Sequence, residues 1–187
     1  INLEKPWWPS LISESATVGD KLYFCTGDIT PTLIRNVECM FVNLDLYEAY
    51  GISTAADGRS IYDVVKDYDW TLDMMMELAI DRVDVNSGMY GLSILNDVCA
   101  DGFFYAGGFR LVENNNGVLK VSDGLSNNSL VNWFDTVQDL FTARYADIAI
   151  DGAAPFKEEN AIFYCGNVSD SQNFSKEGVH FTILPMP

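Results

Sequence analysis

The strongest pattern along the chain is a stripe of apolar residues that repeats with the period of a helix between positions 130 and 141. Its members recur at the i, i+3, i+4 and i+7 spacing and are Leu130, Trp133, Phe134, Val137, Leu140 and Phe141. This spacing places them on one face of a helix, and Asn127, Asn128 or Ser129 can cap its start. The pattern predicts a helix that packs its apolar face on a core.

Short runs rich in β-branched and aromatic residues predict buried strands. They cover residues 21–25, 37–43, 90–94, 161–165 and 178–184. Residues 110–112 and 118–121 flank the sequence Asn114-Asn115-Asn116-Gly117, whose residue types tolerate the positive φ angles of a tight turn. We therefore expect a hairpin at that place.

Helical patterns separate the strands. Residues 44–50 end before Gly51, residues 60–66 form another short helix, and Thr71 can cap a longer helix that continues to Arg82. Less regular stretches are a connecting segment over 1–20, a helix or turn over 99–109, a short acidic helix over 155–161, and a helix or loop over 167–176. Strands that alternate with helices of unequal length predict an α/β fold with a mixed, largely parallel sheet.

The net charge of the chain limits the classes of ligand that it is expected to bind. The 187 residues include 11 Lys and Arg against 27 Asp and Glu, which gives a net charge of −16. A nucleic-acid partner requires a basic face, and a negative field repels anionic membranes and polyanions. No apolar stretch approaches the roughly 20 residues of a membrane helix. Neutral and cationic ligands therefore remain.

The motifs of nucleotide binding, zinc proteolysis and serine hydrolysis are absent from the sequence. His180 is the only histidine, and its place inside a predicted strand favours a structural or surface role. Cys25, Cys39, Cys99 and Cys165 lack the spacing of a zinc site, so we expect separate buried thiols, with one disulfide left open for an oxidising compartment. We expect neither a metal nor a cofactor.

Two kinds of side chain in the sequence are compatible with a carbohydrate ligand or substrate. Asp28, Asp97 and Asp101 lie in turns or at the ends of elements, which leaves a carboxylate-based glycosidase as an alternative. Aromatic rings in irregular segments can stack on sugar faces, although most are expected in the core: Trp7, Trp8, Tyr90, Phe103, Phe104, Tyr105 and Tyr164.

The order of several short motifs resembles a known family. The motifs are Trp7-Trp8, the segment 18–24, Thr26-Gly27-Asp28, Phe41-Val42-Asn43-Leu44-Asp45-Leu46, Tyr50-Gly51-Ile52, Trp70-Thr71-Leu72-Asp73, and Leu184-Pro185-Met186-Pro187. In this order they resemble the bacterial extracellular solute-binding proteins of family 1, the sugar-type receptors of ABC importers related to maltose-binding protein. The resemblance spans nearly the whole chain.

The resemblance implies an α/β fold of the periplasmic-binding-protein-like type II class, helix-rich with a small mixed sheet. It implies a two-lobed receptor in which the chain is a central fragment. Residues 1–36 would be a hinge-proximal segment of the first lobe, and residues 37–187 the second lobe with its return crossing strand. Such receptors bind a sugar-like solute between the lobes and deliver it to the membrane permease. They are extracellular, as periplasmic proteins or as lipoproteins whose N-terminal anchor would lie in the absent part.

The resemblance also points to the ends of strands that face the cleft. Asn36 occupies a position that is a sugar-binding carboxylate in the maltose-binding relative, with Arg35 beside it. Gly166-Asn167-Val168 stands where that relative carries a stacking tryptophan after a glycine. The expected ligand-binding residues are hydrogen-bonding groups and not catalysts: Asp28, Arg35, Asn36, Asn96, Asp97 and Asn167.

Three hypotheses follow for the function. The leading one is the substrate-binding component of an ABC importer, which would not be an enzyme. The alternatives are the carboxylate-based glycosidase and a cell-surface interaction domain that has no response to sugars.

Overall fold

A five-stranded mixed sheet forms the centre of the protein in the computed structural model, which describes residues 2–52, 58–80, 83, 85–95, 100–126, 128–142, 146–148 and 152–187. The strand order is β7-β4-β8-β3-β9. Their bounds are Ala146–Ile148 for β7, Tyr90–Ile94 for β4, Ala161–Asn167 for β8, Glu38–Asn43 for β3 and Phe181–Leu184 for β9. β4 runs parallel to β7 and β8, whereas β3 runs antiparallel to both β8 and β9.

Apolar side chains cover both faces of the central strands. Along β3, Met40 and Val42 belong to one buried cluster and Phe41 to another, because successive side chains of a strand point to opposite faces. The first cluster receives Val64 from α4 (Ile61–Lys66), Met75 from α5 (Leu72–Ile80) and Leu140 from α7 (Asn128–Thr142). The sheet is therefore packed between helices, as its continuous apolar runs predict.

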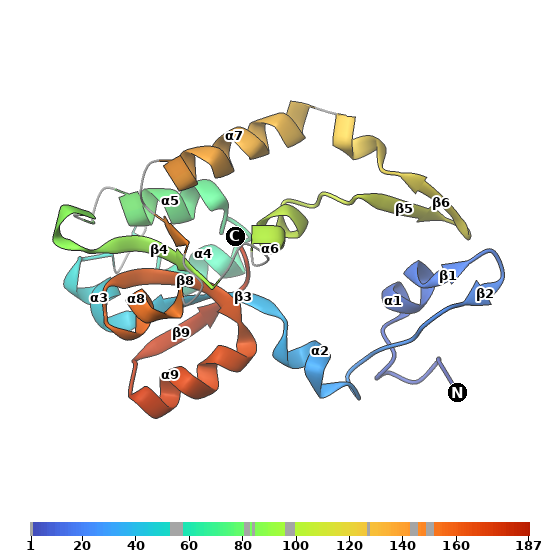
Figure 1. Cartoon of the computed structure of the whole chain (residues 1–187), viewed down its shortest axis with the longest axis horizontal. Helices are drawn as coiled ribbons and strands as arrows, with labels where there is room; N and C mark the ends of the chain where they lie inside the picture. Colours follow the sequence, from blue (N-terminus) through green and yellow to red (C-terminus); the bar gives the residue numbers. More distant parts are fainter. Residues whose placement is uncertain are drawn as a thin grey trace.

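The second cluster consists mainly of aromatic rings. Phe156 of α8 (Ala153–Lys157) and Phe174 of α9 (Ser171–Glu177) meet Phe41 and Tyr164 with ring centroids 5.0–6.3 Å apart. Figure 1 shows α8 and α9 together on one side of the sheet, with α4 and α5 on the other. The order of layers is helix, sheet, helix.

Side-chain caps begin three of the helices that the sequence predicts, and the cap at Thr71 is the one that the sequence indicates. Asn43 Oδ1 accepts a hydrogen bond from Leu46 N at 3.0 Å and starts α3 (Leu44–Ala49) directly after β3. Ser60 Oγ accepts from Asp63 N at the start of α4, and Thr71 Oγ1 accepts from Met74 N at the start of α5. Each cap satisfies a backbone N–H that has no partner within its helix.

Two hairpins lie apart from the sheet. After α6 (Ala100–Ala106), β5 (Val112–Asn115) pairs with β6 (Val118–Val121), and Asn116 and Gly117 have φ angles of 53° and 85°, which confirms the predicted turn. The N-terminal part contains α1 (Ser10–Ser15) and the two-residue strands β1 (Thr17–Val18) and β2 (Lys21–Leu22). Figure 1 shows both hairpins at the same end of the molecule, while α2 (Pro31–Arg35) leads from the N-terminal part to β3.

Three short helical turns complete the description: η1 (Val85–Ser87), η3 (Asp123–Ser126) and η4 (Val168–Asp170). The α9 helix ends at Gly178, whose φ of 80° closes the helix before β9. Among the described helices, none combines the length and apolar character needed to cross a bilayer.

Several expectations about local structure are wrong. Residues 21–25 are not a buried strand: only Lys21 and Leu22 are paired, and Tyr23 and Phe24 are exposed because this segment lies outside the central sheet. The helix expected over 155–161 begins at Ala153 and ends at Lys157, since Ala161 opens β8. The sheet has as many antiparallel as parallel pairings, because β3 opposes both neighbours. The sequence patterns also miss α1, α2 and β7.

Candidate functional site

The end of β8 meets the start of β3 at one edge of the sheet. Asn167 is the register partner of Glu38, and Val168 N donates a hydrogen bond to Val37 O at 2.9 Å. The chain after β9 passes the same edge, where Trp70 Nε1 donates to Pro185 O at 3.0 Å. Three segments that are distant in sequence therefore bring their ends together.

A groove of about 580 Å³ opens at this edge, and we call it the strand-end groove. Its walls come from the start of β3, from α6, and from the segment after β9. The lining residues are Val37, Glu38, Cys39, Gly102, Tyr105, Ala106, Val168, Ile183, Leu184, Pro185 and Met186. The groove is mostly apolar, and among its described lining residues only Glu38 carries a carboxyl group.

The Glu38 carboxyl group lies against the first turn of α6. An added Cβ at Gly102 would overlap with Glu38 Oε2 and lie 3.1 Å from Met186 Cε. The carboxyl group can therefore occupy this position only because residue 102 is a glycine. Partial burial raises the pKa of Glu38 above its ordinary value of 4.5, and the nearby negative charge of Asp101 raises it further. The groove thus contains an acid that keeps its proton to a higher pH than an exposed glutamate.

Asn167 lies at the same edge of the sheet, at the end of β8, and its neighbours hold its backbone in place. Asp170 Oδ2 accepts hydrogen bonds from Asn167 N at 3.0 Å and from the Tyr164 hydroxyl at 2.9 Å. Because Tyr164 is fully buried, this carboxylate fixes the chain at the point where β8 ends. The half-buried Asn167 is therefore presented on a rigid support.

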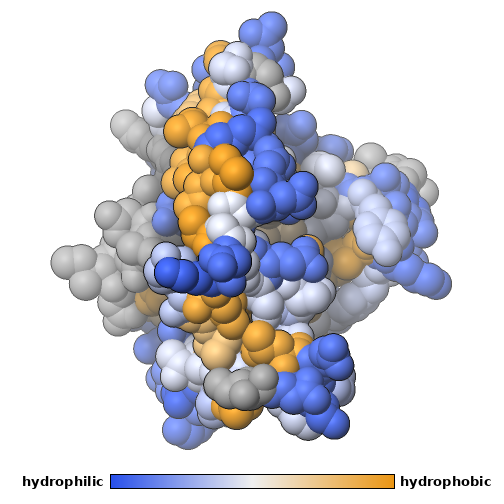
Figure 2. All heavy atoms as spheres, turned by 90° about the vertical axis from the view of Figure 1, so that its right-hand side faces the viewer, coloured by the Kyte–Doolittle hydropathy of each residue, from blue (hydrophilic) through white to orange (hydrophobic). Residues whose placement is uncertain are grey.

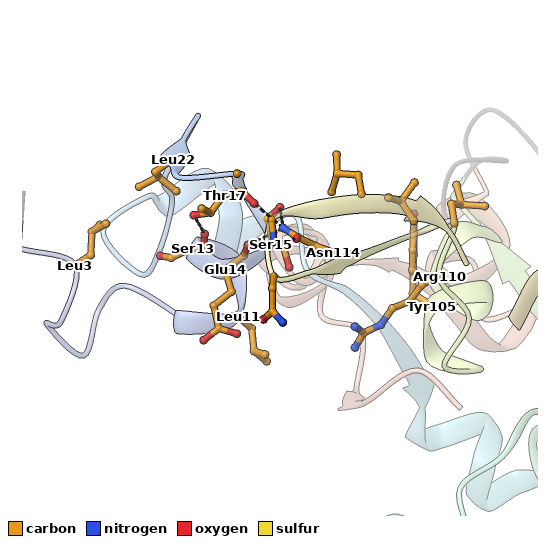
Figure 3. A pocket seen from close by; sticks show the side chains of 16 residues that line it. Leu3, Leu11, Ser13, Glu14, Ser15, Thr17, Leu22, Tyr105, Arg110 and Asn114 are labelled. Atoms are coloured by element: carbon orange, nitrogen blue, oxygen red, sulfur yellow. Dashed lines mark hydrogen bonds between the residues drawn. The ribbon is translucent and has the colours of Figure 1, made fainter. Parts of the chain in front are cut away.

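A second and larger concavity lies between the two hairpins, and we call it the interhairpin hollow. It encloses about 1040 Å³. Figure 3 shows Leu11 and Glu14 of α1 on one side of it and Arg110 on the other. The wall residues are Leu3, Leu11, Ser13, Glu14, Ser15, Thr17, Gly19, Leu22, Tyr105, Arg110, Leu111, Val112, Asn114, Asn116, Gly117 and Leu119.

Tyr105 joins the two concavities, because its side chain lines both. The residue is 58% exposed, and its ring packs edge-on against Phe104 at 5.3 Å between centroids. A ring that is supported on one side and free on the other can stack on an apolar ligand face. The groove and the hollow together offer this ring, carboxyl groups, a guanidinium, amides and hydroxyls, which is a set suited to a polyhydroxylated ligand.

The structure places only part of the predicted site residues together. Asn36 ends α2 and lies two residues before Glu38, while α2 packs against η4, so Arg35, Asn36 and Asn167 share one neighbourhood beside the strand-end groove. Asp28 lies in the exposed turn before α2, where its N–H donates to Trp7 O at 3.1 Å. Asn96 and Asp97 lie outside the described residues.

Sequence reasoning missed Glu38 and Arg110. An acidic residue at the first position of an otherwise apolar buried strand is the signal that marks Glu38, because such a residue must lie at the sheet edge. Arg110 carries no comparable signal, since its role depends on how the two hairpins approach each other. Tyr105 appears in the sequence among seven candidate rings, of which Phe103 and Tyr164 prove to be buried core.

Metal ligation finds no support within the part of the chain that the structure describes. No three side chains of His, Cys, Asp and Glu converge there. Cys39 and Cys165 are buried and Cys25 is half-buried, while Cys99 lies outside the described residues. His180 is exposed and its Nδ1 lies 3.0 Å from Asp45 Oδ1.

Solved structures share this fold. The chain matches a cyclo/maltodextrin-binding protein solved with maltotetraose with a TM-score of 0.65 and 19% identity. It matches an extracellular solute-binding protein from Staphylococcus aureus, solved with maltose, with a TM-score of 0.64 and 15% identity. The GacH receptor of Streptomyces glaucescens, solved unliganded and with acarbose, gives a TM-score of 0.60 and 14% identity. The fold is therefore periplasmic-binding-protein-like, as predicted.

The three matches cover nearly all of the present chain but only part of each solved chain. They include 100%, 100% and 97% of the present chain but 44%, 45% and 43% of the three solved chains, so this chain spans less than half of their length. No protein-family model matches the sequence, and no curated protein matches it. At these identities the likeness establishes the fold.

Proposed function

We propose that this protein binds a carbohydrate-like solute in the cleft made by the strand-end groove and the interhairpin hollow. The observation that carries the proposal is the match of 97–100% of the chain to three proteins solved with maltotetraose, maltose or acarbose. The chemistry of the cleft agrees with it. Tyr105 offers a ring face, while Glu38 and Arg110 offer hydrogen-bonding groups to hydroxyls.

The finer proposal is that the protein is the substrate-binding component of an ABC importer outside the cytoplasmic membrane, and delivers the solute to a permease. We assign residues 1–36 to a first lobe and residues 37–187 to a second lobe and its return strand. An apolar band along the two hairpins (Figure 2) supports a receptor larger than this segment, because exposed bands of this kind mark surfaces that other polypeptide covers. The exposed apolar residues of the two hairpins include Leu22, Val112, Val118 and Val121.

The test is a titration of the chain with maltose, maltotetraose and acarbose, followed by calorimetry and intrinsic tryptophan fluorescence. We expect dissociation constants of about 1 mM, because a cleft with walls from half of a receptor makes fewer contacts. Absence of any heat, fluorescence change or shift in melting temperature across a wider sugar panel would reject the proposal in favour of an interaction domain that does not bind sugars.

Tyr105→Ala identifies the location of the ligand. Loss of the ring should weaken sugar binding by about tenfold, which corresponds to roughly 1.4 kcal/mol. Tyr62→Ala is the matched control, because Tyr62 is 52% exposed on α4 and lines neither concavity. Equal effects of the two substitutions would place the ligand elsewhere.

A second candidate function follows from the pair of Glu38 and Asp101. A carboxyl group with a raised pKa beside another carboxylate is the arrangement of a glycosidase acid and its partner. Hydrolysis of an aryl-glycoside panel that Glu38→Gln and Asp101→Asn both abolish would establish the enzyme. We expect no hydrolysis above the rate with heat-denatured protein.

A further inference from the structure

The two walls of the interhairpin hollow come from segments about a hundred residues apart in the chain. One wall is the N-terminal segment 10–22, and the other is the segment 110–119 with the β5–β6 hairpin. Figure 3 shows the side chain of Asn114 reaching from the second wall to the first. The relative position of the walls therefore depends on the contacts at this point.

Asn114 makes hydrogen bonds to both walls. Its Nδ2 donates to Thr17 O at 2.6 Å and to Glu14 O at 3.0 Å, with Ser15 O at 3.4 Å as a weaker contact. Its Oδ1 accepts from Gly117 N at 2.8 Å. The oxygen is thus fixed by its own hairpin turn. The amide protons are therefore directed toward carbonyl oxygens at the end of α1 and in β1.

Gly117 makes the second contact between the walls. Its carbonyl oxygen accepts a hydrogen bond from Gly19 N at 2.9 Å. A Cβ at position 117 would lie 2.7 Å from Gly19 N and 2.7 Å from Gly19 O. Glycine is required here by the φ of 85° and also by the close approach of the other hairpin.

We propose that Asn114 is a positioning residue of the ligand site, and that with Gly117 it forms a latch that sets the width of the interhairpin hollow. The inference rests on the proposed function, since it takes the hollow as part of the sugar site. Glu14 and Arg110 lie on opposite walls, so the latch determines how far apart their charged groups stand. A polyhydroxylated ligand that contacts both walls needs this separation to be fixed before it binds.

The experiment compares Asn114→Asp with Asn115→Asp. Both variants add one negative charge to β5, but only the first removes the amide protons that reach α1; Asn115 is exposed and lines neither concavity. Gly117→Ala is compared with Gly88→Ala in the same way. Gly88 has a φ of 82° and nothing within 4 Å of an added Cβ, so both glycine variants carry the same backbone strain and only Gly117→Ala meets Gly19.

Two measurements are made on each variant, namely hydrogen exchange of the Gly19 amide without ligand and the dissociation constant for maltotetraose. We expect Asn114→Asp and Gly117→Ala to accelerate Gly19 exchange and to weaken maltotetraose binding, each about tenfold or more, while the amides of β3 and β8 keep their protection. The two controls should change neither quantity by more than about twofold.

The outcomes separate the inference from the function on which it rests. Unchanged Gly19 exchange in Asn114→Asp would overturn the latch. Faster exchange with an unchanged dissociation constant would overturn the positioning role and leave sugar binding intact. A native chain that binds no member of the sugar panel would overturn the proposed function and the positioning role together, whereas the exchange result would still decide whether the latch exists.

Discussion

The Glu38 carboxyl group occupies the space that a side-chain carbon at Gly102 would need. One residue opens the buried strand β3 and the other lies in the first turn of α6, so their contact joins the sheet edge to the helix that carries Tyr105. Because the carboxyl is the far end of a flexible side chain, this contact is adjustable. The contact should therefore affect both the free energy of unfolding and the pKa of Glu38.

Gly102→Ala should move the Glu38 carboxyl group toward solvent with little loss of stability. The free energy of unfolding should change by less than about 1 kcal/mol, since the gain in helix propensity offsets the crowding. The pKa of Glu38, followed by NMR of its carboxyl carbon, should fall toward 4.5. An unchanged pKa would show that the carboxyl does not respond to a Cβ at position 102.

Gly152→Ala should be much more damaging than Gly102→Ala. The added Cβ would overlap with the carbonyl group of Ile94, which is backbone at the end of a central strand and cannot move aside. We expect a loss of about 3 kcal/mol or more in urea unfolding. A loss as small as that of Gly102→Ala would contradict the packing of α8 on β4.

Stability should depend on pH through Glu38. Its raised pKa means that the folded chain binds this proton more tightly than the unfolded chain does, so the contribution of Glu38 falls as pH rises from about 4.5 through the folded pKa. Glu38→Gln should therefore unfold at higher urea than the native chain at pH 7 and at the same urea at pH 4. The exposed Glu158→Gln serves as control, and an equal pH dependence in both variants would contradict the assignment.

Phe174→Ala should cost about 3–5 kcal/mol of unfolding free energy, because the ring is fully buried among Phe41, Phe156 and Tyr164. Phe134→Ala removes the same ring from α7, where it is 55% exposed. The control should cost less than about 1 kcal/mol. Similar losses in chemical denaturation would show that the aromatic cluster under α9 is not the packed core described above.

Trp70→Phe should loosen the segment that follows β9. The substitution keeps an aromatic ring near Phe163 but removes the hydrogen bond from Nε1 to Pro185 O, which is worth about 1 kcal/mol. We expect faster hydrogen exchange at Met186 in the mutant. Trp7→Phe, in the N-terminal part, is the control and should leave Met186 exchange unchanged.

Local patterns in the sequence predicted most of the central sheet and its helices. The strands around Met40, Leu92 and Phe163 are apolar on both faces, and a segment of this kind is stable only inside a sheet that helices cover. The cap at Thr71 and the turn at Asn116-Gly117 were equally predictable, because each acts within a few residues. The parallel or antiparallel sense of β3 was not, since it depends on where the chain returns.

The candidate site also combines features that are local in the sequence with features that depend on distant segments. The residue types of Asn36 and Asn167 and their places, shortly before β3 begins and where β8 ends, are local facts, and they indicate one edge of the sheet. Glu38 beside Gly102, Tyr105 between two concavities, and Asn114 bonded to the end of α1 depend on packing between distant segments of the chain. The sequence by itself determined the elements and their buried faces, because periodicity and capping are local. Only the tertiary structure decided which polar groups share a cleft, because that depends on how distant segments pack.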